Sequence, residues 1–281
     1  MQNIISIVLT FCTINVMLYA ELLEWRVYFE TFWLLVFRER DASCGACKYS
    51  GRHFRTARAW KHLKGSYPDV FTRLESIAKV QSVKGSNAIE GIVTSEQRIN
   101  EIVNQNSAPI NHNEAEIAGY RDVLNLIHEN FTDLDIRVRD IHRLHEIMLS
   151  YTPIGGGSYK QNDNVITEVD AAGQRRVRFA PTPAGGETVT AMEQLILAFI
   201  DARNNYNINQ LLMIPCFILD FLCIHPFADC NGRMSRLLSL LLLYKNGLDA
   251  GKYISFEEQI NKKNGITTKP CVCPMTVGMK T

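Results

Sequence analysis

The chain has no excess of charge of either sign. Its 281 residues carry 30 Lys and Arg against 29 Asp and Glu, which gives a net charge of +1 and a pI near 7.6. A protein that binds nucleic acid through its phosphates usually shows a basic excess or a basic stripe. The composition therefore argues against nucleic acid as a partner. No internal repeat or low-complexity tract is visible either, so a repeat architecture is not expected.

A disulfide framework is also missing. The eight cysteines are dispersed along the chain, and several lie inside apolar runs, where free cysteine behaves as a small buried hydrophobe. This distribution favours reduced thiols in a cytoplasmic protein. One alternative stays open, because Cys44 and Cys47 in "CGAC" and Cys271 and Cys273 in "CVC" could together offer four thiolates to zinc. No ligand spacing links the two pairs.

Neither end of the chain has a clear pattern. The first twenty residues carry no charge, so they lack the positive region of a secretory signal, and their five Asn, Ser and Thr residues weaken a spanning helix of about 20 residues. We leave residues 1–67 as an N-terminal region of open structure. The pattern is compatible with three alternatives: membrane contact through residues 1–40, a buried helix, or a start codon assigned too far upstream. Residues 265–281 form an irregular tail, compatible with a shortened or frame-shifted end.

Between these ends, apolar residues recur with the 3.6-residue period of helices. Helices are expected in "RLESIAKVQSV" ending near Gly85, in "TSEQRINEIV" opening on a capping box of Thr94 and Gln97, and in the segments "NEAEIAGYRDVLNLIHENF", "DIRVRDIHRLHEIMLS", "ETVTAMEQLILAFIDARN" and "SFEEQINKKNG". Residues 152–186 break the period, and the alternating "VRF" after "DAAG" predicts a short hairpin with that turn. The sequence thus predicts an all-α domain over residues 68–264 with one small β insertion.

One polar stretch, "IHPFADCNGRMSRLL" from Ile224 to Leu238, separates two strongly apolar segments. We expect a helix over residues 211–224 and another beginning near Gly232. The first turn of the second helix has unpaired N–H groups and a partial positive charge, so it is a ready anion site. Arg233 and Arg236 repel each other there and oppose the helix dipole unless an anion lies between them. This conflict predicts a bound polyphosphate.

The neighbouring residues suit a reaction on phosphate. His225 has an ordinary pKa near ~6.5 and can accept a proton from an attacking hydroxyl at neutral pH. Asp229 offers the hard oxygen that Mg²⁺ takes beside phosphate oxygens. The positive cradle would stabilise the charge that develops on the transferred group.

The string "HPFADCNGRMSR" resembles the signature of the Fic family: His-Pro-Phe, an acidic residue, Gly-Asn-Gly-Arg, and a second Arg three residues on. The resemblance implies an all-α Fic-type helical bundle with a small β-hairpin flap. It also implies transfer of AMP from ATP to a Ser, Thr or Tyr hydroxyl of a target protein. Carried over by position, the roles are His225 as general base, Asp229 as Mg²⁺ ligand, Asn231 and Gly232 at the α-phosphate, Arg233 and Arg236 at the β- and γ-phosphates, and Phe227 as the anchor of the loop.

Two further segments resemble parts of this family. "GSYKQNDNV" resembles the flap that aligns the target segment by strand-like pairing, with Gly157, Tyr159, Asn162, Asn164 and Val165 as candidate residues. "SNAIEG" resembles an inhibitory motif, in which Glu90, on the same helix face as Ser86, would pair with Arg236 and exclude productive ATP. Its plain structural alternative is a short helix that ends at Gly91 as a C-cap.

Two departures from the pattern keep other functions open. Cys230 replaces the first glycine of the Gly-Asn-Gly turn in the nucleotide-binding string, and a side chain costs energy there if φ is positive. The segment after "FEEQINK" lacks the aromatic helix that would enclose adenine. The alternatives are a Fic enzyme with another phosphate donor and a catalytically attenuated or dead binding module. Removal of AMP and homodimer formation also stay open.

Overall fold

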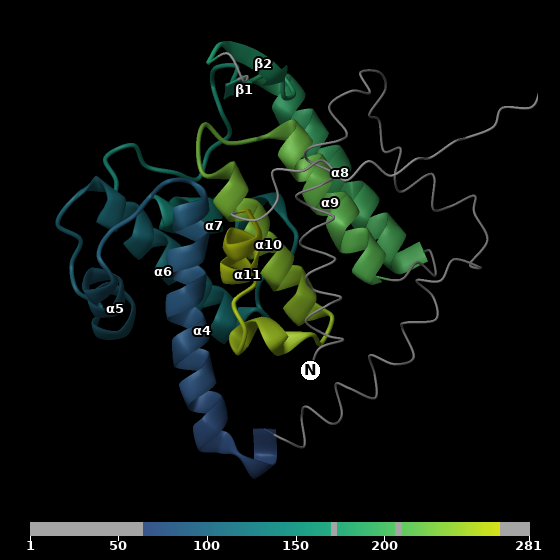
Figure 1. Ribbon diagram of the computed structural model, residues 1–281. Coiled ribbons are helices and arrows are strands. Elements are labelled where there is room, and N and C mark those ends of the chain that lie inside the picture. The colour runs from purple at the N-terminus through teal and green to yellow at the C-terminus, as the bar shows by residue number, and fades with distance from the viewer. Residues whose placement is uncertain (1–63, 170–172, 206–209, 265–281) are drawn as a thin grey trace, which may run out of the picture.

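The structure is a computed structural model that describes residues 64–169, 173–205 and 210–264 (Figure 1). Its elements in chain order are α4 (Pro68–Ile89), α5 (Glu96–Gln105), α6 (His112–Asn130), α7 (Val138–Met148), β1 (Ile166–Val169), β2 (Arg175–Phe179), α8 (Gly186–Asn205), α9 (Gln210–Ile224), α10 (Asn231–Lys245), the 3-10 turn η2 (Asp249–Lys252) and α11 (Phe256–Asn264). The predicted all-α fold is confirmed. The two cysteine pairs, the N-terminal segment and the tail lie outside the described residues.

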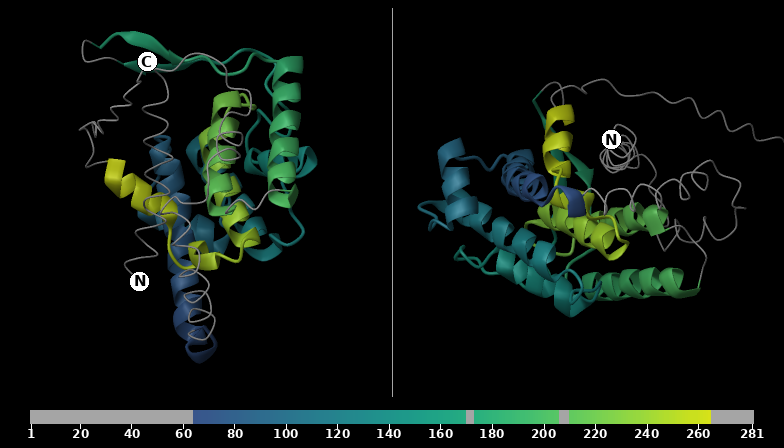
Figure 2. Two further views of the ribbon diagram at one scale, coloured as in Figure 1. Left: turned by 90° about the vertical axis from the view of Figure 1, so that its right-hand side faces the viewer. Right: turned by 90° about the horizontal axis from the view of Figure 1, so that it is seen from below.

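Helix α10 forms the centre of the core. It packs against α9, α6 and α4, and α8 lies along the other side of α9 (Figures 1 and 2). Nearly all of its apolar side chains are buried: Met234, Leu237, Leu238, Leu240, Leu241, Leu242, Leu243 and Tyr244. Because α10 is held from several sides, its N-terminal turn has a fixed position among the other helices.

A two-stranded antiparallel hairpin lies in the interval where the sequence predicts one. Strand β1 pairs with β2 in a register that sets Val169 opposite Arg175, with an irregularity between Ile166 and Thr167. The hairpin projects from the helical body beyond α8 (Figures 1 and 2). Three residues of the predicted "DAAG" turn, 170–172, fall outside the described residues.

Helix α4 corrects one predicted boundary. It does not end near Gly85 but continues for another turn to Ile89, so Ser86 lies inside it and Glu90 is its C-cap. Helix α11 packs on α4 so closely that a Cβ at position 85 would lie 2.8 Å from the backbone nitrogen of Glu258. The glycine is therefore used for close helix packing, and this contact outweighs its weak helix propensity.

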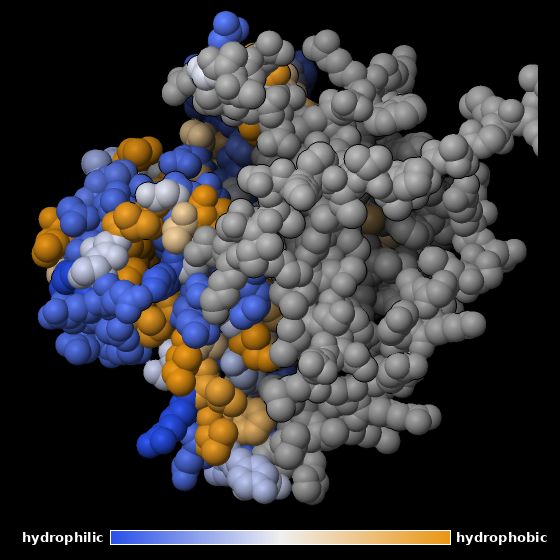
Figure 3. Space-filling view, viewed as in Figure 1, coloured by the Kyte–Doolittle hydropathy of each residue, from blue (hydrophilic) through white to orange (hydrophobic). Residues whose placement is uncertain are grey.

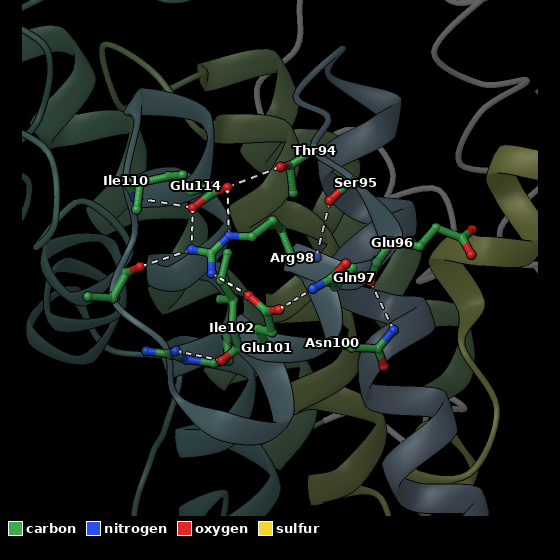
Figure 4. A network of polar contacts seen from close by, with 12 residues as sticks. Thr94, Ser95, Glu96, Gln97, Arg98, Asn100, Glu101, Ile102, Ile110 and Glu114 are labelled. Carbon is green, nitrogen blue, oxygen red and sulfur yellow. Dashed lines mark hydrogen bonds and ion pairs between the residues drawn. The ribbon is translucent and has the colours of Figure 1, made fainter.

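A polar cluster joins α5 to α6 and corrects the first predicted capping box (Figure 4). The N-cap of α5 is Ser95, not Thr94, and its side chain accepts from the backbone N–H of Arg98. Arg98 binds the buried Glu114 on α6 through two guanidinium nitrogens, at 3.1 and 2.7 Å, and Thr94 donates to the same carboxylate. The start of α11 is capped in the same way, since Ser255 accepts from the backbone N–H of Glu258.

The first half of α4 carries an exposed apolar stripe. Tyr67, Val70, Leu74 and Ile77 recur at helical spacing and are 36–58% exposed, and apolar surface follows the lower half of this helix in Figure 3. Within the described ranges, no helix is both long enough and apolar enough to cross a membrane.

Candidate active site

The polar stretch forms a tight loop, residues 225–230, between the end of α9 and the start of α10. Both ends of this loop are left-handed, with φ of 53° at His225 and 65° at Cys230. The left-handed conformation costs a residue with a Cβ roughly 1–2 kcal/mol, so surrounding contacts must fix the loop. Residue 230 thus has the positive φ at which a side chain costs energy.

His225 is held in one tautomer. Its Nδ1 lies 3.3 Å from the carbonyl oxygen of Leu222, which can only accept, so Nδ1 carries the proton and donates it. The Nε2 atom then keeps its lone pair. Burial lowers the pKa of the imidazole below its ordinary value, which favours the neutral form at physiological pH. A neutral imidazole with a free Nε2 can act as a general base.

Phe227 anchors the middle of the loop in the core, as predicted from its apolar bulk. It is fully buried, and its ring stacks on the imidazole of His145 in α7, with centroids 3.8 Å apart and planes 9° apart. Nδ1 of His145 accepts from the backbone N–H of Gly157, so Nε2 donates to the carbonyl of Asp229 at 3.3 Å. Burial lowers the pKa of His145 to about 4, which keeps it neutral in this double role.

The segment predicted as a flap lies against this loop. Gly157–Val165 precedes β1, and its members Tyr159 and Asn164 are half-buried. Asn164 donates to the carbonyl of Phe227, and the ring of Tyr159 contacts His142 at 4.3 Å. Asn162 and Val165 are exposed. Within the described residues, strand pairing in this part of the chain begins at Ile166, directly after the segment.

Asn231 also supports the loop. It is buried, and its side chain accepts from the N–H of Phe227 and donates to the carbonyl of the same residue, at 3.0 and 2.8 Å. Since both ends of the amide are committed to the backbone, the side chain is not directed at a phosphate. The neighbouring backbone N–H groups of the first turn of α10 are the kind of group that binds an anion.

Arg233 has a different partner from the predicted phosphate. Its guanidinium is buried in an ion pair with Glu116 of α6, and it donates to Asn87 of α4 at 3.3 Å and to the sulfur of Cys230 at 3.0 Å. Its Nε is buried without a hydrogen-bond partner. The expected repulsion between the two arginines is thus relieved by protein carboxylates, one for each guanidinium.

Arg236 takes the predicted partners on α4. It donates to the hydroxyl of Ser86 at 2.8 Å, to the carbonyl of Ser86 at 3.0 Å and to Oε1 of Glu90 at 2.8 Å. The same oxygen of Glu90 would lie 2.5 Å from a Cβ at Gly232. The Glu90 carboxylate therefore lies on the first turn of α10, where an anion is expected. Gly91 has φ of 77° and ends α4, so the structural reading of this motif holds as well.

Residues 134–243 match the Fic/DOC family. This part of the chain is a Fic domain.

The chain is also similar to parts of curated proteins, some of which carry the Fic name. The chain is 28% identical over 115 residues to the protein adenylyltransferase Fic of Drosophila melanogaster, which covers 41% of the chain and 21% of that protein. It is 29% identical over 128 residues to the ribonucleoside-diphosphate reductase small chain of Ostreid herpesvirus 1, which covers 42% of the chain and 20% of that protein. The chain thus spans about a fifth of the curated relatives that it matches.

Solved structures show the same fold. A Fic domain containing signaling protein from Bacteroides thetaiotaomicron has a TM-score of 0.58 at 21% identity, and the match covers 75% of this chain and 78% of that one. A Fic family protein from Desulfovibrio desulfuricans has a TM-score of 0.54 at 22% identity, over 72% of this chain and 60% of that one.

The remaining site residue of the Fic domain, Asp229, fits a magnesium ion. Its carboxylate is exposed, and one oxygen accepts from the N–H of Cys230 at 2.6 Å. Glu116 and Cys230 have ligand atoms within 4.8 Å, but Glu116 is paired with Arg233, and burial raises the pKa of the Cys230 thiol to about 12. Mg²⁺ prefers oxygen and is usually bound by one or two carboxylates with water and phosphate. Asp229 alone would be the protein ligand.

Four residues that hold the Fic loop were not found from the sequence: Asn87, Glu116, His145 and Lys160. Glu116 and His145 lie inside regular helical patterns, where nothing in the spacing distinguishes them from surface residues. Asn87 lies within the inhibitory motif, and Lys160 within the predicted flap, so their positions were noticed but their roles were not. A buried charge is visible only once the helices are packed.

Proposed function

We propose that the chain is a protein adenylyltransferase that transfers AMP from Mg-ATP to a Ser, Thr or Tyr hydroxyl of a target protein, and that Glu90 holds it inhibited. The observation that carries the proposal is the convergence on one helix end: the neutral His225, the first turn of α10, and Arg236. Glu90 and Asp229 both act electrostatically on His225, so these groups lie close together. The Fic match and the Drosophila adenylyltransferases support this reaction type.

In the proposed reaction the target hydroxyl oxygen attacks the α-phosphorus of ATP. The proton of the hydroxyl passes to Nε2 of His225, which is free because Nδ1 is bound to Leu222. The bond between the α-phosphorus and the bridging oxygen breaks, and pyrophosphate leaves. Backbone N–H groups at the start of α10 stabilise the charge on the phosphate oxygens. Mg²⁺, held by Asp229, would neutralise charge on the phosphates.

The inhibition follows from one contact. The carboxylate of Glu90 binds Arg236 and contacts the first turn at Gly232, so it takes the place of a phosphate. Charge-assisted hydrogen bonds of this kind are roughly twice as strong as neutral ones. ATP must displace Glu90 before its terminal phosphate can reach Arg236.

The first prediction concerns Glu90→Gly. We expect the variant to incorporate more label from α-³²P-ATP into itself than the wild type does, because Arg236 becomes available to the nucleotide. Glu129→Gly is the matched control, since Glu129 is an exposed carboxylate near the C-terminal end of α6. A Glu90→Gly, His225→Ala double variant should lose the signal. Equal incorporation by wild type and Glu90→Gly would contradict the inhibition.

A second candidate is a Fic-fold binding module with little or no turnover. It is favoured by the strained Cys230 and by the pairing of Arg233 with Glu116 and Asn87 in place of a phosphate. The same assay separates the candidates. Transfer of label from γ-³²P-ATP but not α-³²P-ATP would indicate another phosphate transfer, and no transfer from either by Glu90→Gly would favour the binding module.

A further inference from the structure

Lys160 is a buried ammonium group next to the Fic loop. Its side chain is among the largest fully buried ones, with 2% of the residue exposed. Placing a lysine in such surroundings costs energy unless its charge is paired or hydrogen-bonded. Burial lowers the pKa of its amine. Hydrogen-bond acceptors near Lys160 must therefore stabilise its buried ammonium group.

Lys160 donates hydrogen bonds to the carbonyls of the two residues that flank His225. The ammonium donates to the carbonyl of Ile224 at 3.2 Å, and the backbone N–H of Lys160 donates to the carbonyl of Pro226 at 2.9 Å. Ile224 is the last residue of α9, so its carbonyl has no partner within the helix and lies at the negative end of the helix dipole. The side-chain oxygen of Asn164 also accepts a hydrogen bond from the ammonium, at 2.8 Å.

The residue between these two carbonyls is strained. His225 has φ of 53°, and a non-glycine residue keeps such a conformation only where its surroundings impose it. Lys160 supplies one contact on each side. The orientation of the imidazole depends on this backbone conformation, because His225 has its positive φ in the same structure in which its Nδ1 lies 3.3 Å from the carbonyl of Leu222.

Lys160 also acts on the charge of His225. Its positive charge disfavours a second one on the imidazole and so lowers the pKa of His225, in the same direction as burial. The carboxylates of Glu90 and Asp229 act in the opposite direction. When Glu90 is removed or displaced, the balance shifts further toward the neutral imidazole.

We propose that Lys160 is a positioning residue for the transfer reaction, which fixes the left-handed backbone of His225 and keeps its imidazole oriented and available as a base. This inference rests on the proposed function, since it concerns the same histidine. In this proposal the segment before β1 affects the rate of the reaction as well as the structure of the loop.

The test compares Lys160→Met and Lys160→Arg in the Glu90→Gly background. Met keeps the length of the side chain without its charge, and Arg keeps the charge. We expect kcat to fall about 10- to 100-fold in Lys160→Met, the size of effect that a small misplacement of a reacting group produces. KM for ATP should stay within about threefold, because the phosphates are held by α10. Lys160→Arg should recover part of kcat.

Lys245→Met is the matched control. Lys245 is partly buried and its ammonium also donates to backbone carbonyls, those of Phe131 and Leu134, but it lies at the far end of α10. Both Met variants should lose thermal stability. A kcat of Lys160→Met no lower than that of Lys245→Met would overturn the proposal.

A second measurement separates this proposal from the proposed function. In histidine-labelled protein, the NMR titration of His225 should move to higher pH in Lys160→Met, because a nearby positive charge is lost, and the acidic limb of kcat should move with it. An unchanged titration, with Nδ1 still protonated, would overturn the role of Lys160 whether or not ATP is used. A Glu90→Gly protein without any transfer, but with a shifted titration, would refute the proposed function alone.

Discussion

At the scale of single residues, Cys230 shows how a rare conformation is tolerated in this Fic domain. It is left-handed, yet its side chain is buried in the core and its sulfur accepts from Arg233. Burial raises the pKa of the thiol to about 12, so it stays uncharged at neutral pH. The contacts of the side chain offset part of the strain of roughly 1–2 kcal/mol that its Cβ causes.

We predict that Cys230→Gly changes stability little and raises turnover. Relief of strain is opposed by the entropy of glycine, about 0.5–1 kcal/mol, and by the lost burial, so the net change should stay within about 1 kcal/mol. Turnover should rise because the loop can approach the nucleotide more closely. Asn106→Gly is the control, since Asn106 is also left-handed but caps α5. Denaturant unfolding and label transfer measure both effects, and equal turnover in Cys230→Gly and its parent would contradict the second.

The positions of site residues could be predicted where the spacing of residues close in sequence determines the local structure. The string from His225 to Arg236 indicates a loop and a helix start, and the i,i+4 pair of Ser86 and Glu90 indicates a shared face. The direction of Arg233 could not be predicted, because Glu116 lies 117 positions away and approaches it only after α6 packs on α10. The two hydrogen bonds between the Asn231 side chain and the backbone of Phe227 likewise depend on the loop conformation.

At the scale of elements, the contact between α4 and α11 supports the helix that carries Glu90. Tyr120 of α6 donates to Glu257 of α11, and Glu257 accepts from Ser255, so buried polar contacts reinforce the packing. The close approach at Gly85 leaves no room for a side chain.

We predict that Gly85→Ala destabilises the protein by about 1–3 kcal/mol, the usual cost of overpacking, although alanine is the better helix former. The added Cβ would meet the backbone of α11, which cannot move aside as a side chain can. Gly186→Ala in α8 is the control, because nothing lies within 4 Å of that Cβ. Unfolding in urea compares the two. A Gly85→Ala protein as stable as Gly186→Ala would show that α11 moves freely.

The cluster between α5 and α6 should make stability depend on pH. Arg98 holds the pKa of Glu114 at about 2, below its ordinary value of 4.5. A lowered pKa means that the ion pair stabilises the fold fully above about pH 5 and that this contribution is lost as the pH falls toward 2. Glu114→Gln should be less stable at pH 7 and show a smaller loss between pH 5 and pH 2. Glu129→Gln, an exposed substitution, should follow the wild type in acid titrations of unfolding.

Elements were predictable where their helices bury one face, and the order of helices in the Fic domain follows that pattern. The end of α4 was wrong because glycine was interpreted as a stop, whereas packing with α11 extends the helix through it. The hairpin was predictable from the alternating residues of β2 and the preceding turn, whereas the hydrogen bond from the backbone N–H of Lys160 to Pro226 depends on the loop conformation.

At the scale of the whole molecule, the proposed binding of nucleotide would be linked to stability. A ligand that binds only the folded form stabilises it by about 2.7 kcal/mol at a hundred times its Kd. We predict that Mg-ATP raises the melting temperature of Glu90→Gly more than that of the wild type at the same concentration, because the wild type must first break the contact of Glu90 with Arg236. Calorimetric scans with and without nucleotide measure this. Equal shifts in both proteins would mean that Glu90 does not compete.

The pairing of each arginine near the start of α10 with its own carboxylate has a kinetic consequence. With Arg233 matched by Glu116 and Arg236 by Glu90, the mouth of α10 presents little net field to an approaching polyanion. If ATP displaces Glu90, as the proposed function requires, Arg236 loses its paired carboxylate and would attract the triphosphate at long range. The rate at which ATP associates with the protein should therefore depend on ionic strength only when Glu90 is displaced or removed. Salt weakens such attraction because the Debye length is about 8 Å at physiological ionic strength.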